Sequence, residues 1–178
     1  MKKGANNTEV KKLNRNQVFR YVNKFKRVSK PDIAAALQMS MPTVLQNVNE
    51  LMEQNLVQEV GEFESTGGRK AMAIAPVHDC KYAIGIDITR NHISFVLTDL
   101  SGEVLQHMRM YQPYANEVKY YKQLADTADQ LKKQWNVPEK KFLGYGISIP
   151  GIVDPENNKI LFSHALKISN VSCDVFKQ

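Results

Sequence analysis

The clearest alternation of hydrophobic and polar positions lies in residues 29–54, SKPDIAAALQMSMPTVLQNVNELMEQ. It predicts two short helices joined by a tight turn through residues 38–40. The apolar positions recur at helical spacing: Ile33, Ala34 and Leu37 in the first helix, and Val44, Val48, Leu51 and Met52 in the second. Each helix therefore commits one face to a core.

Both helices have recognisable starting signals. Ser29 is the expected N-cap of the first helix, and Asp32 follows three residues later as in a capping box. Ser40 is the expected N-cap of the second, with Pro42 in its first turn, where a missing N–H costs nothing. The tight turn and the polar outer face of the second helix are typical of a helix-turn-helix that enters a DNA major groove. An ordinary amphipathic hairpin in an all-α core would show the same pattern.

The neighbouring segments extend this pattern into a winged helix-turn-helix. Upstream, Val18, Val22 and Phe25 predict a first amphipathic helix that starts near Asn14 and follows a disordered basic arm over residues 1–12. Downstream, the alternating runs LVQEV and AMAIA flank the loop GEFESTGGRK, which predicts a β-hairpin. A hairpin directly after a recognition helix is expected to be a wing. The alternative is a surface hairpin whose charges only keep it soluble.

The pattern changes after residue 76, where a second domain is expected over residues 77–178. Three β-rich runs, KYAIGIDIT, NHISFVLTDL and EVLQHMRMYQ, precede a helix predicted over residues 116–135. A glycine-rich strand, KKFLGYGISIPGIVD, follows, and KILFSHAL can form a further short strand. The order βββαβ is that of the first half of an RNase H-like or actin-like lobe, although other α/β folds share it. The fold class is therefore α+β or α/β, with a winged helix-turn-helix domain over residues 13–76 and a partial ATPase-like lobe after it.

Charge strengthens the DNA-binding interpretation. The 178-residue chain has a formal net charge of +6, and its content of 43% hydrophobic and 24% charged residues is ordinary for a globular protein. Residues 1–30 contain ten Lys and Arg against the single acid Glu9, whereas residues 77–178 are nearly neutral. The basic excess thus lies before and within the predicted helix-turn-helix, as phosphate contacts require. A solvated basic tail is the alternative.

Other function classes find little support in the sequence. No run approaches the roughly 20 apolar residues of a membrane span, and no signal peptide is recognisable, so a cytoplasmic location is expected. Cys80 and Cys173 belong to no CxxC pair, and the four histidines are scattered: His78, His92, His107 and His164. No metal site and no cofactor is therefore expected.

Three segments together carry a family resemblance. STGGRK at residues 65–70, YAIGIDI at 82–88 and GYGISIPGIVD at 144–154 resemble the ROK family of sugar-responsive bacterial repressors and related sugar kinases. The resemblance implies a repressor of carbohydrate-utilisation genes, with a DNA-binding domain joined to a domain that senses a sugar or sugar phosphate. It also implies a homodimer or higher homo-oligomer, whose operator is read as two half-sites.

Departures from the family argue against an enzyme. In ROK kinases the turn after the first strand resembles D-x-G-G-T-K, whose glycines allow close approach of ATP phosphates. The matching positions here, residues 87–92, read DITRNH: Asp87 is retained but both glycines are replaced. The family's catalytic Asn-x-x-Asp motif and its zinc cluster are expected beyond Gln178. The alternatives that remain open are a ROK-type sugar kinase with an added N-terminal domain, and a winged-helix regulator of another family.

Two sets of site residues follow. On the DNA side, amide side chains on the outer face of the second helix can pair with adenine edges, and Leu45 can meet a thymine methyl. The expected DNA-binding residues are Pro42, Thr43, Leu45, Gln46, Asn47, Asn49, Arg69 and Lys70, of which Pro42, Arg69 and Lys70 position the protein rather than specify sequence. Asn47 lies four residues before Leu51 and can also be partly buried. The resemblance implies Pro150, Gly151 and Asn170 as sugar-binding residues, although Ile168 replaces the family's usual Trp.

Overall fold

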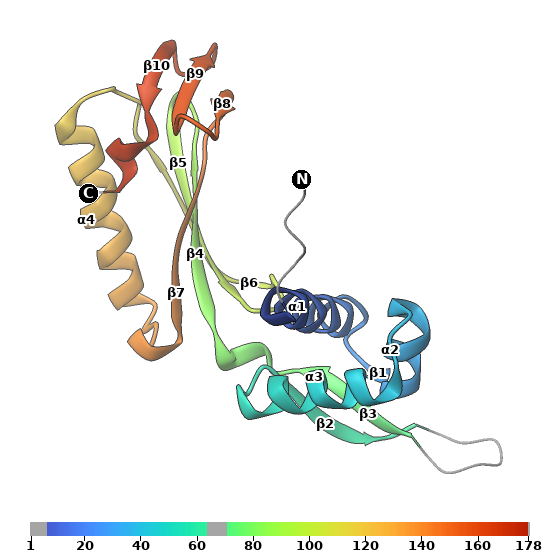
Figure 1. Ribbon diagram of the computed structural model, residues 1–178. Helices are drawn as coiled ribbons and strands as arrows, with labels where there is room; N and C mark the ends of the chain where they lie inside the picture. Colours follow the sequence, from blue (N-terminus) through green and yellow to red (C-terminus); the bar gives the residue numbers. More distant parts are fainter. Residues whose placement is uncertain (1–6, 64–70, 178) are drawn as a thin grey trace, which may run out of the picture. The chain divides into compact units, whose positions relative to one another are not determined.

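The computed structural model describes residues 7–63 and 71–177, which divide into two compact units between Cys80 and Lys81 (Figure 1). Each unit has its own hydrophobic core. The sequence predicts the boundary a few residues earlier, after residue 76.

The N-terminal unit has the element order of a winged helix-turn-helix. Its helices and strands are α1 (Asn7–Phe25), β1 (Val28–Ser29), α2 (Lys30–Leu37), α3 (Met41–Glu53), β2 (Val57–Glu62) and β3 (Met72–Pro76). Strands β2 and β3 pair antiparallel, as the two alternating runs predict. The two-residue strand β1, which is too short for any periodicity to reveal, adds a third strand by pairing with Ala73 and Ile74 of β3. The predicted fold of this unit is confirmed.

Local capping fixes where α2 and α3 begin. The Ser29 hydroxyl accepts a hydrogen bond from the Asp32 backbone N–H at 3.2 Å, and the Asp32 carboxylate accepts from the Ser29 backbone N–H at 3.0 Å. This reciprocal pair completes the predicted capping box. The Ser40 hydroxyl caps α3 by accepting a hydrogen bond from the Thr43 backbone N–H at 3.3 Å. Between the helices, Gln38 takes the left-handed conformation, with φ of 53°, and so turns the chain sharply.

Replacing Ser29 with alanine is expected to lower the free energy of unfolding by about 0.5–2 kcal/mol, because α2 loses its side-chain cap. The measurement is urea unfolding of the chain followed by circular dichroism. Ser169→Ala is the matched control, because Ser169 is exposed in strand β10 (Ile168–Ser172) and begins no helix. Equal stability of the two variants would contradict the structural role of this cap.

The core of the N-terminal unit draws on all three helices and on the sheet. Its fully buried side chains are Val18 and Val22 of α1, Ile33 of α2, Val44, Val48 and Leu51 of α3, and Ile74 of β3. Phe25 was expected on the buried stripe of α1, but it is 50% exposed. It lies in the last turn of the helix, where its ring packs against Tyr21 with ring centroids 4.6 Å apart.

The predicted disordered arm is also partly wrong. Helix α1 begins at Asn7 rather than near Asn14, so residues 7–12 are helical, while residues 1–6 lie outside the described residues. The segment after Asn7 contains neither glycine nor proline, and Glu9 lies in the first turn, where a carboxylate is favoured by the helix dipole. Lys11 and Lys12, which the sequence predicts in a loose arm, are therefore exposed residues of a helix.

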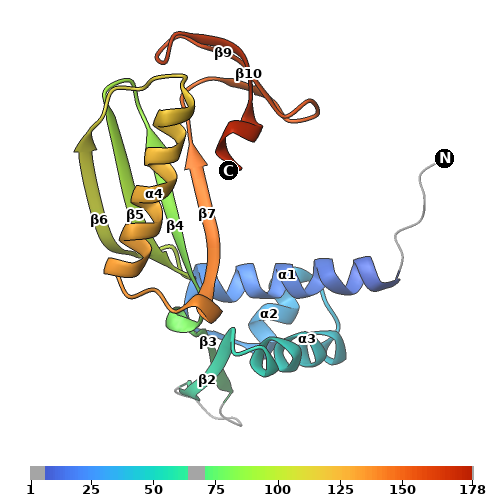
Figure 2. The ribbon, with the colours of Figure 1, turned by 90° about the vertical axis from the view of Figure 1, so that its left-hand side faces the viewer.

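The C-terminal unit contains a four-stranded mixed sheet covered on one face by a helix (Figure 2). Its first elements are β4 (Tyr82–Ile88), β5 (His92–Asp99), β6 (Val104–Tyr111), α4 (Val118–Gln134) and β7 (Phe142–Ser148). The sheet order is β6-β5-β4-β7, in which β7 returns after α4 to run parallel to β4. This is the βββαβ arrangement that the sequence predicts.

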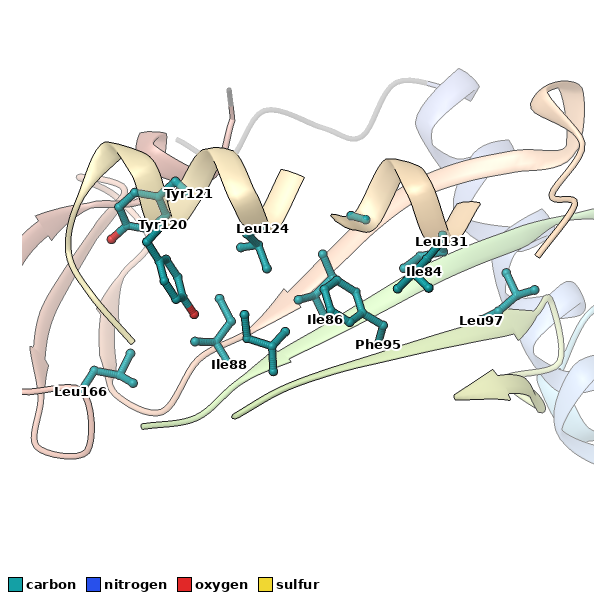
Figure 3. Packing of buried hydrophobic residues seen from close by; sticks show 12 residues of the cluster. Ile84, Ile86, Ile88, Phe95, Leu97, Tyr120, Tyr121, Leu124, Leu131 and Leu166 are labelled. Carbon is teal, nitrogen blue, oxygen red and sulfur yellow. The ribbon is translucent and has the colours of Figure 1, made fainter. Parts of the chain in front are cut away.

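Alternating residues of the sheet meet one stripe of α4. Ile84, Ile86 and Ile88 of β4 and Phe95 of β5 are buried against Leu124 and Leu131 of α4, as Figure 3 shows. The stripe ends in a tyrosine cluster in which the Tyr121 hydroxyl donates to the Asn116 side-chain carbonyl at 2.8 Å. Burial raises the pKa of Tyr120 to about 12, so its phenol stays neutral at any physiological pH.

A second, smaller sheet follows and was only partly predicted. Strands β8 (Ile152–Asp154), β9 (Lys159–Ser163) and β10 (Ile168–Ser172) form an antiparallel sheet of order β10-β9-β8. Only β9 corresponds to the expected short strand in KILFSHAL. The other two are three and five residues long, and half-exposed strands of that length carry little periodic signal.

Candidate nucleic-acid interface

The face of α3 opposite the core is open to solvent. Exposed residues recur along it about one helical turn apart: Met41, Pro42, Leu45, Gln46, Asn49 and Glu53. Met41 and Leu45 are each 41% exposed, so this face also presents two large apolar side chains. An exposed helix face that mixes amides with apolar groups can both hydrogen-bond base edges and contact thymine methyls.

Gln46 is tied to a charged network that reaches a second helix. Its Nε2 donates a hydrogen bond to Oε1 of Glu50 at 3.1 Å. The other oxygen of Glu50, Oε2, forms an ion pair with Nη1 of Arg15 on α1 at 3.2 Å. Sequence reasoning assigned no role to Arg15 or Glu50. Residues 46 and 50 are four positions apart on a helix, so the first contact can be predicted from the sequence. The ion pair cannot, because Arg15 lies 35 positions before Glu50.

Asn47 differs from its expected role. Only 7% of the residue is exposed, and its Nδ2 donates to the Thr43 backbone carbonyl at 2.7 Å. A buried amide already bonded to its own helix is poorly placed to reach a base, so Asn47 is no longer expected to contact one. The Thr43 hydroxyl lies 2.8 Å from that of Ser40, at the start of α3, and Thr43 is half-buried. Thr43 thus stands at the edge of the exposed face.

The wing residues expected to contact phosphate, Arg69 and Lys70, lie outside the described residues. At the base of the wing, Nη2 of Arg27 donates to the Glu62 backbone carbonyl at 3.0 Å, and the guanidinium lies 5.1 Å from the centre of the Phe63 ring. Lys30 pairs with Glu59 at 2.9 Å. These two cations therefore link the segment that leads into α2 to strand β2. The basic side chains left exposed in this unit lie mainly along α1: Lys11, Lys12, Arg20, Lys24 and Lys26.

The three expected sugar-binding residues occupy two places in the C-terminal unit. Pro150 and Gly151 line a shallow hollow with Phe162, His164 and Ala165, but Asn170 is not among the residues that line it. Asn170 is exposed in β10 in the left-handed conformation, with φ of 55°. The structure therefore does not bring the three residues together.

Nearby, the carboxylate of Asp154 is occupied by its own turn. It accepts hydrogen bonds from the Asn157 side chain at 2.7 Å and from the backbone N–H groups of Glu156 and Asn157. The bonds from Asn157 hold the pKa of Asp154 below its usual value, so the group stays ionised at neutral pH.

Gly151 has a packing reason to be glycine. A Cβ at this position would lie 2.8 Å from the Phe162 carbonyl oxygen and 3.3 Å from the Ser163 Cβ. Gly151→Ala is therefore expected to lower the free energy of unfolding by about 1–3 kcal/mol, as overpacking does. Gly146→Ala in β7 is the matched control, because an added Cβ there meets no atom within 4 Å. Urea unfolding of both variants decides this, and a neutral Gly151→Ala would show that the loop moves aside freely.

The turn after β4, where the kinases of the family resemble D-x-G-G-T-K, is a tight hairpin. The Thr89 backbone N–H donates to the His92 carbonyl at 2.9 Å, and the His92 N–H donates to the Thr89 hydroxyl at 3.2 Å. Arg90 and Asn91 form its exposed tip. Side chains thus stand where backbone amides would have to approach a phosphate.

Two further features of the described residues bear on the kind of site. Within residues 7–63 and 71–177, no group of three or more His, Cys, Asp and Glu side chains gathers in a way that could hold a metal ion. In the same part of the chain, no helix has the length and apolar character needed to cross a membrane.

Comparison with known proteins gives a consistent result. The model of the ROK family matches residues 83–175. The chain is 32% identical over 161 residues to the xylose repressor of Bacillus spizizenii (strain ATCC 23059 / NRRL B-14472 / W23), covering 89% of this chain and 41% of that protein. It is 27% identical over 161 residues to the DNA-binding transcriptional dual regulator NagC of Escherichia coli (strain K12), covering 90% and 40% respectively. The chain thus spans about two fifths of the length of the curated relatives it matches.

A solved structure shares the fold over nearly the whole chain. The crystal structure of a ROK family transcriptional regulator, described as a homolog of the E. coli MLC protein, aligns with a TM-score of 0.71 at 16% sequence identity. The alignment covers 94% of this chain and 42% of that one, so it spans both units. The predicted fold, a winged helix-turn-helix followed by part of a ROK lobe, is confirmed.

Proposed function

The chain belongs to the ROK family, and we propose that it acts as a sequence-specific DNA-binding transcriptional regulator. The observation that carries the proposal is the geometry of α3: one face is buried in the core, and the opposite face presents Leu45, Gln46 and Asn49 to solvent. That is the arrangement by which a recognition helix reads a major groove. Pro42, Arg69 and Lys70 are proposed to position the helix and the wing on the phosphate backbone, and Thr43, at the edge of the exposed face, to contact a base.

The regulation we propose is repression of carbohydrate-utilisation genes, relieved by a sugar or a sugar phosphate. The names of the relatives support this: they include a xylose repressor and N-acetylglucosamine repressors. Pro150 and Gly151 are the proposed contacts on the sugar side, with Asn170 as a separate candidate. The effect of xylose, N-acetylglucosamine and their phosphates on DNA binding tests this part. If none of these compounds changes the affinity for DNA, the proposal that this chain responds to a sugar effector is contradicted.

A sugar kinase is not the function we propose. Where the kinases of the family need glycines, the β4–β5 hairpin has Arg90 and Asn91 at its tip. The backbone N–H groups of Thr89 and His92 are already bonded within the turn, to the His92 carbonyl and the Thr89 hydroxyl. Close approach of a phosphate to that backbone would require the hairpin to open. The relatives reported above are repressors and a transcriptional regulator, which favours regulation over phosphoryl transfer.

The experiment that tests the proposal is selection of bound duplexes from a random DNA pool by the purified chain. We expect one motif to be enriched, and a homodimer would enrich two inverted half-sites about 10 base pairs or a multiple of that apart. Enrichment of no sequence over the starting pool would contradict sequence-specific DNA binding.

A further inference from the structure

The half-buried carboxylate of Glu50 borders the exposed face of α3, the surface proposed to approach DNA. Glu50 lies one turn after Gln46, and one third of its side chain is exposed. Its two oxygens have different partners: Oε1 accepts from the Gln46 amide at 3.1 Å, and Oε2 pairs with Arg15 at 3.2 Å. The three residues form a continuous series of contacts from the exposed face of α3 to α1.

The hydrogen bond from Gln46 to Glu50 fixes the orientation of the Gln46 amide. An ionised carboxylate can only accept hydrogen bonds, so the NH₂ group of Gln46 must face Glu50. The opposite amide orientation would bring two acceptors, Oε1 of Gln46 and Oε1 of Glu50, against each other. One N–H of Gln46 is thus engaged, and what remains for a ligand is one N–H and the carbonyl oxygen.

That remaining pair matches one purine better than the other. In the major groove, adenine offers an acceptor at N7 and a donor at N6, whereas guanine offers acceptors at both N7 and O6. A donor and an acceptor side by side complement adenine. To bind guanine bidentately, Gln46 would have to use both N–H groups and so abandon Glu50.

We propose that Glu50, held by Arg15, is a positioning residue that makes Gln46 read adenine and reject guanine. This inference rests on the proposed function, because it concerns how the same helix reads DNA. Arg15 has two effects: it fixes the carboxylate by the ion pair, and its charge offsets the repulsion between Glu50 and the DNA phosphates.

The test uses four duplexes that carry A, G, C or T at one position of the selected motif. That position is the one at which Gln46→Ala abolishes the base preference. Dissociation constants are measured by fluorescence anisotropy for the unmodified chain, for Glu50→Ala and for Glu53→Ala. Glu53 is the matched control, because it is an exposed glutamate on the same helix, so its removal changes the net charge equally.

We expect the unmodified chain to prefer adenine over guanine by roughly tenfold or more, as a bidentate contact does. In Glu50→Ala this ratio falls at least about threefold, with the other positions of the motif unaffected. Glu53→Ala keeps the ratio, although both variants bind all duplexes more tightly through the lost negative charge. A merely structural role of Glu50 would lower affinity for the four duplexes alike, and circular dichroism confirms that each variant is folded.

The inference is overturned if Glu50→Ala retains the adenine-over-guanine ratio, or if Gln46→Ala changes no base preference anywhere in the motif. In either case an enriched motif leaves the proposed function standing. If no motif is enriched by the unmodified chain, it is the proposed function that fails, and the inference fails with it.

Discussion

Phe95→Ala is expected to destabilise the C-terminal unit by about 3–5 kcal/mol, the cost of removing a fully buried aromatic ring. Phe95 is completely buried on β5, the strand between β4 and β6, and Figure 3 shows its ring beside Ile86 beneath α4. The cavity would lie inside the interface between α4 and the sheet, where neighbouring isoleucines have little freedom to collapse into it. Most small domains have only about 5–15 kcal/mol of stability to lose.

Urea unfolding measured by circular dichroism tests this expectation. Leu143→Ala is the control, because Leu143 is 60% exposed and its truncation should change the free energy of unfolding by less than about 0.5 kcal/mol. The two hydrophobic cores have no residue in common, so we expect the proposed winged-helix domain to keep its own transition in Phe95→Ala. A variant as stable as Leu143→Ala would contradict the packing described for Phe95.

Gln46→Ala is expected to weaken binding to the selected duplex roughly 5- to 150-fold, the equivalent of the 1–3 kcal/mol of one bidentate base contact. Binding to random DNA should change little, because non-specific affinity comes from phosphate contacts. The measurement is a gel-shift titration on both duplexes at two salt concentrations. Gln17→Ala is the matched control, since Gln17 is an exposed glutamine on α1. Equal loss on random DNA would contradict base readout by Gln46.

Lys70→Ala should behave in the opposite way. Loss of a phosphate contact is expected to weaken binding to all duplexes alike and to reduce the slope of log affinity against log salt concentration by about one. The same two-salt titration measures this slope. A loss confined to the selected duplex would instead make Lys70 a base-reading residue.

Local signals in the sequence predict the local features of this fold. The caps at Ser29 and Ser40 appear where the sequence places them, because each depends only on residues three positions away. The alternating runs of β4 and β5 are similarly decisive, since one face of each of these two strands is buried at every second residue. The order of α4 and β7 then follows from connection lengths and periodicity.

Features set by tertiary contacts escape such reasoning. Strand β1 consists of two residues whose pairing with β3 is decided about 45 positions further along the chain. The stripe of α1 predicts a buried Phe25, but periodicity does not say where the facing surface ends. The ion pair of Arg15 with Glu50 is equally non-local. Asn47 is a different case: its spacing before Leu51 indicates partial burial, and the structure buries it with its amide bonded to the Thr43 carbonyl of its own helix.

We propose above all that this chain reads DNA sequence through α3. The most direct measurement compares its dissociation constants for the selected duplex and for a scrambled duplex of the same composition, at one physiological salt concentration. We expect binding to the selected duplex to be tighter by roughly 10³-fold or more, the lower end of the usual range for specific recognition. Equal dissociation constants for the two duplexes would contradict it.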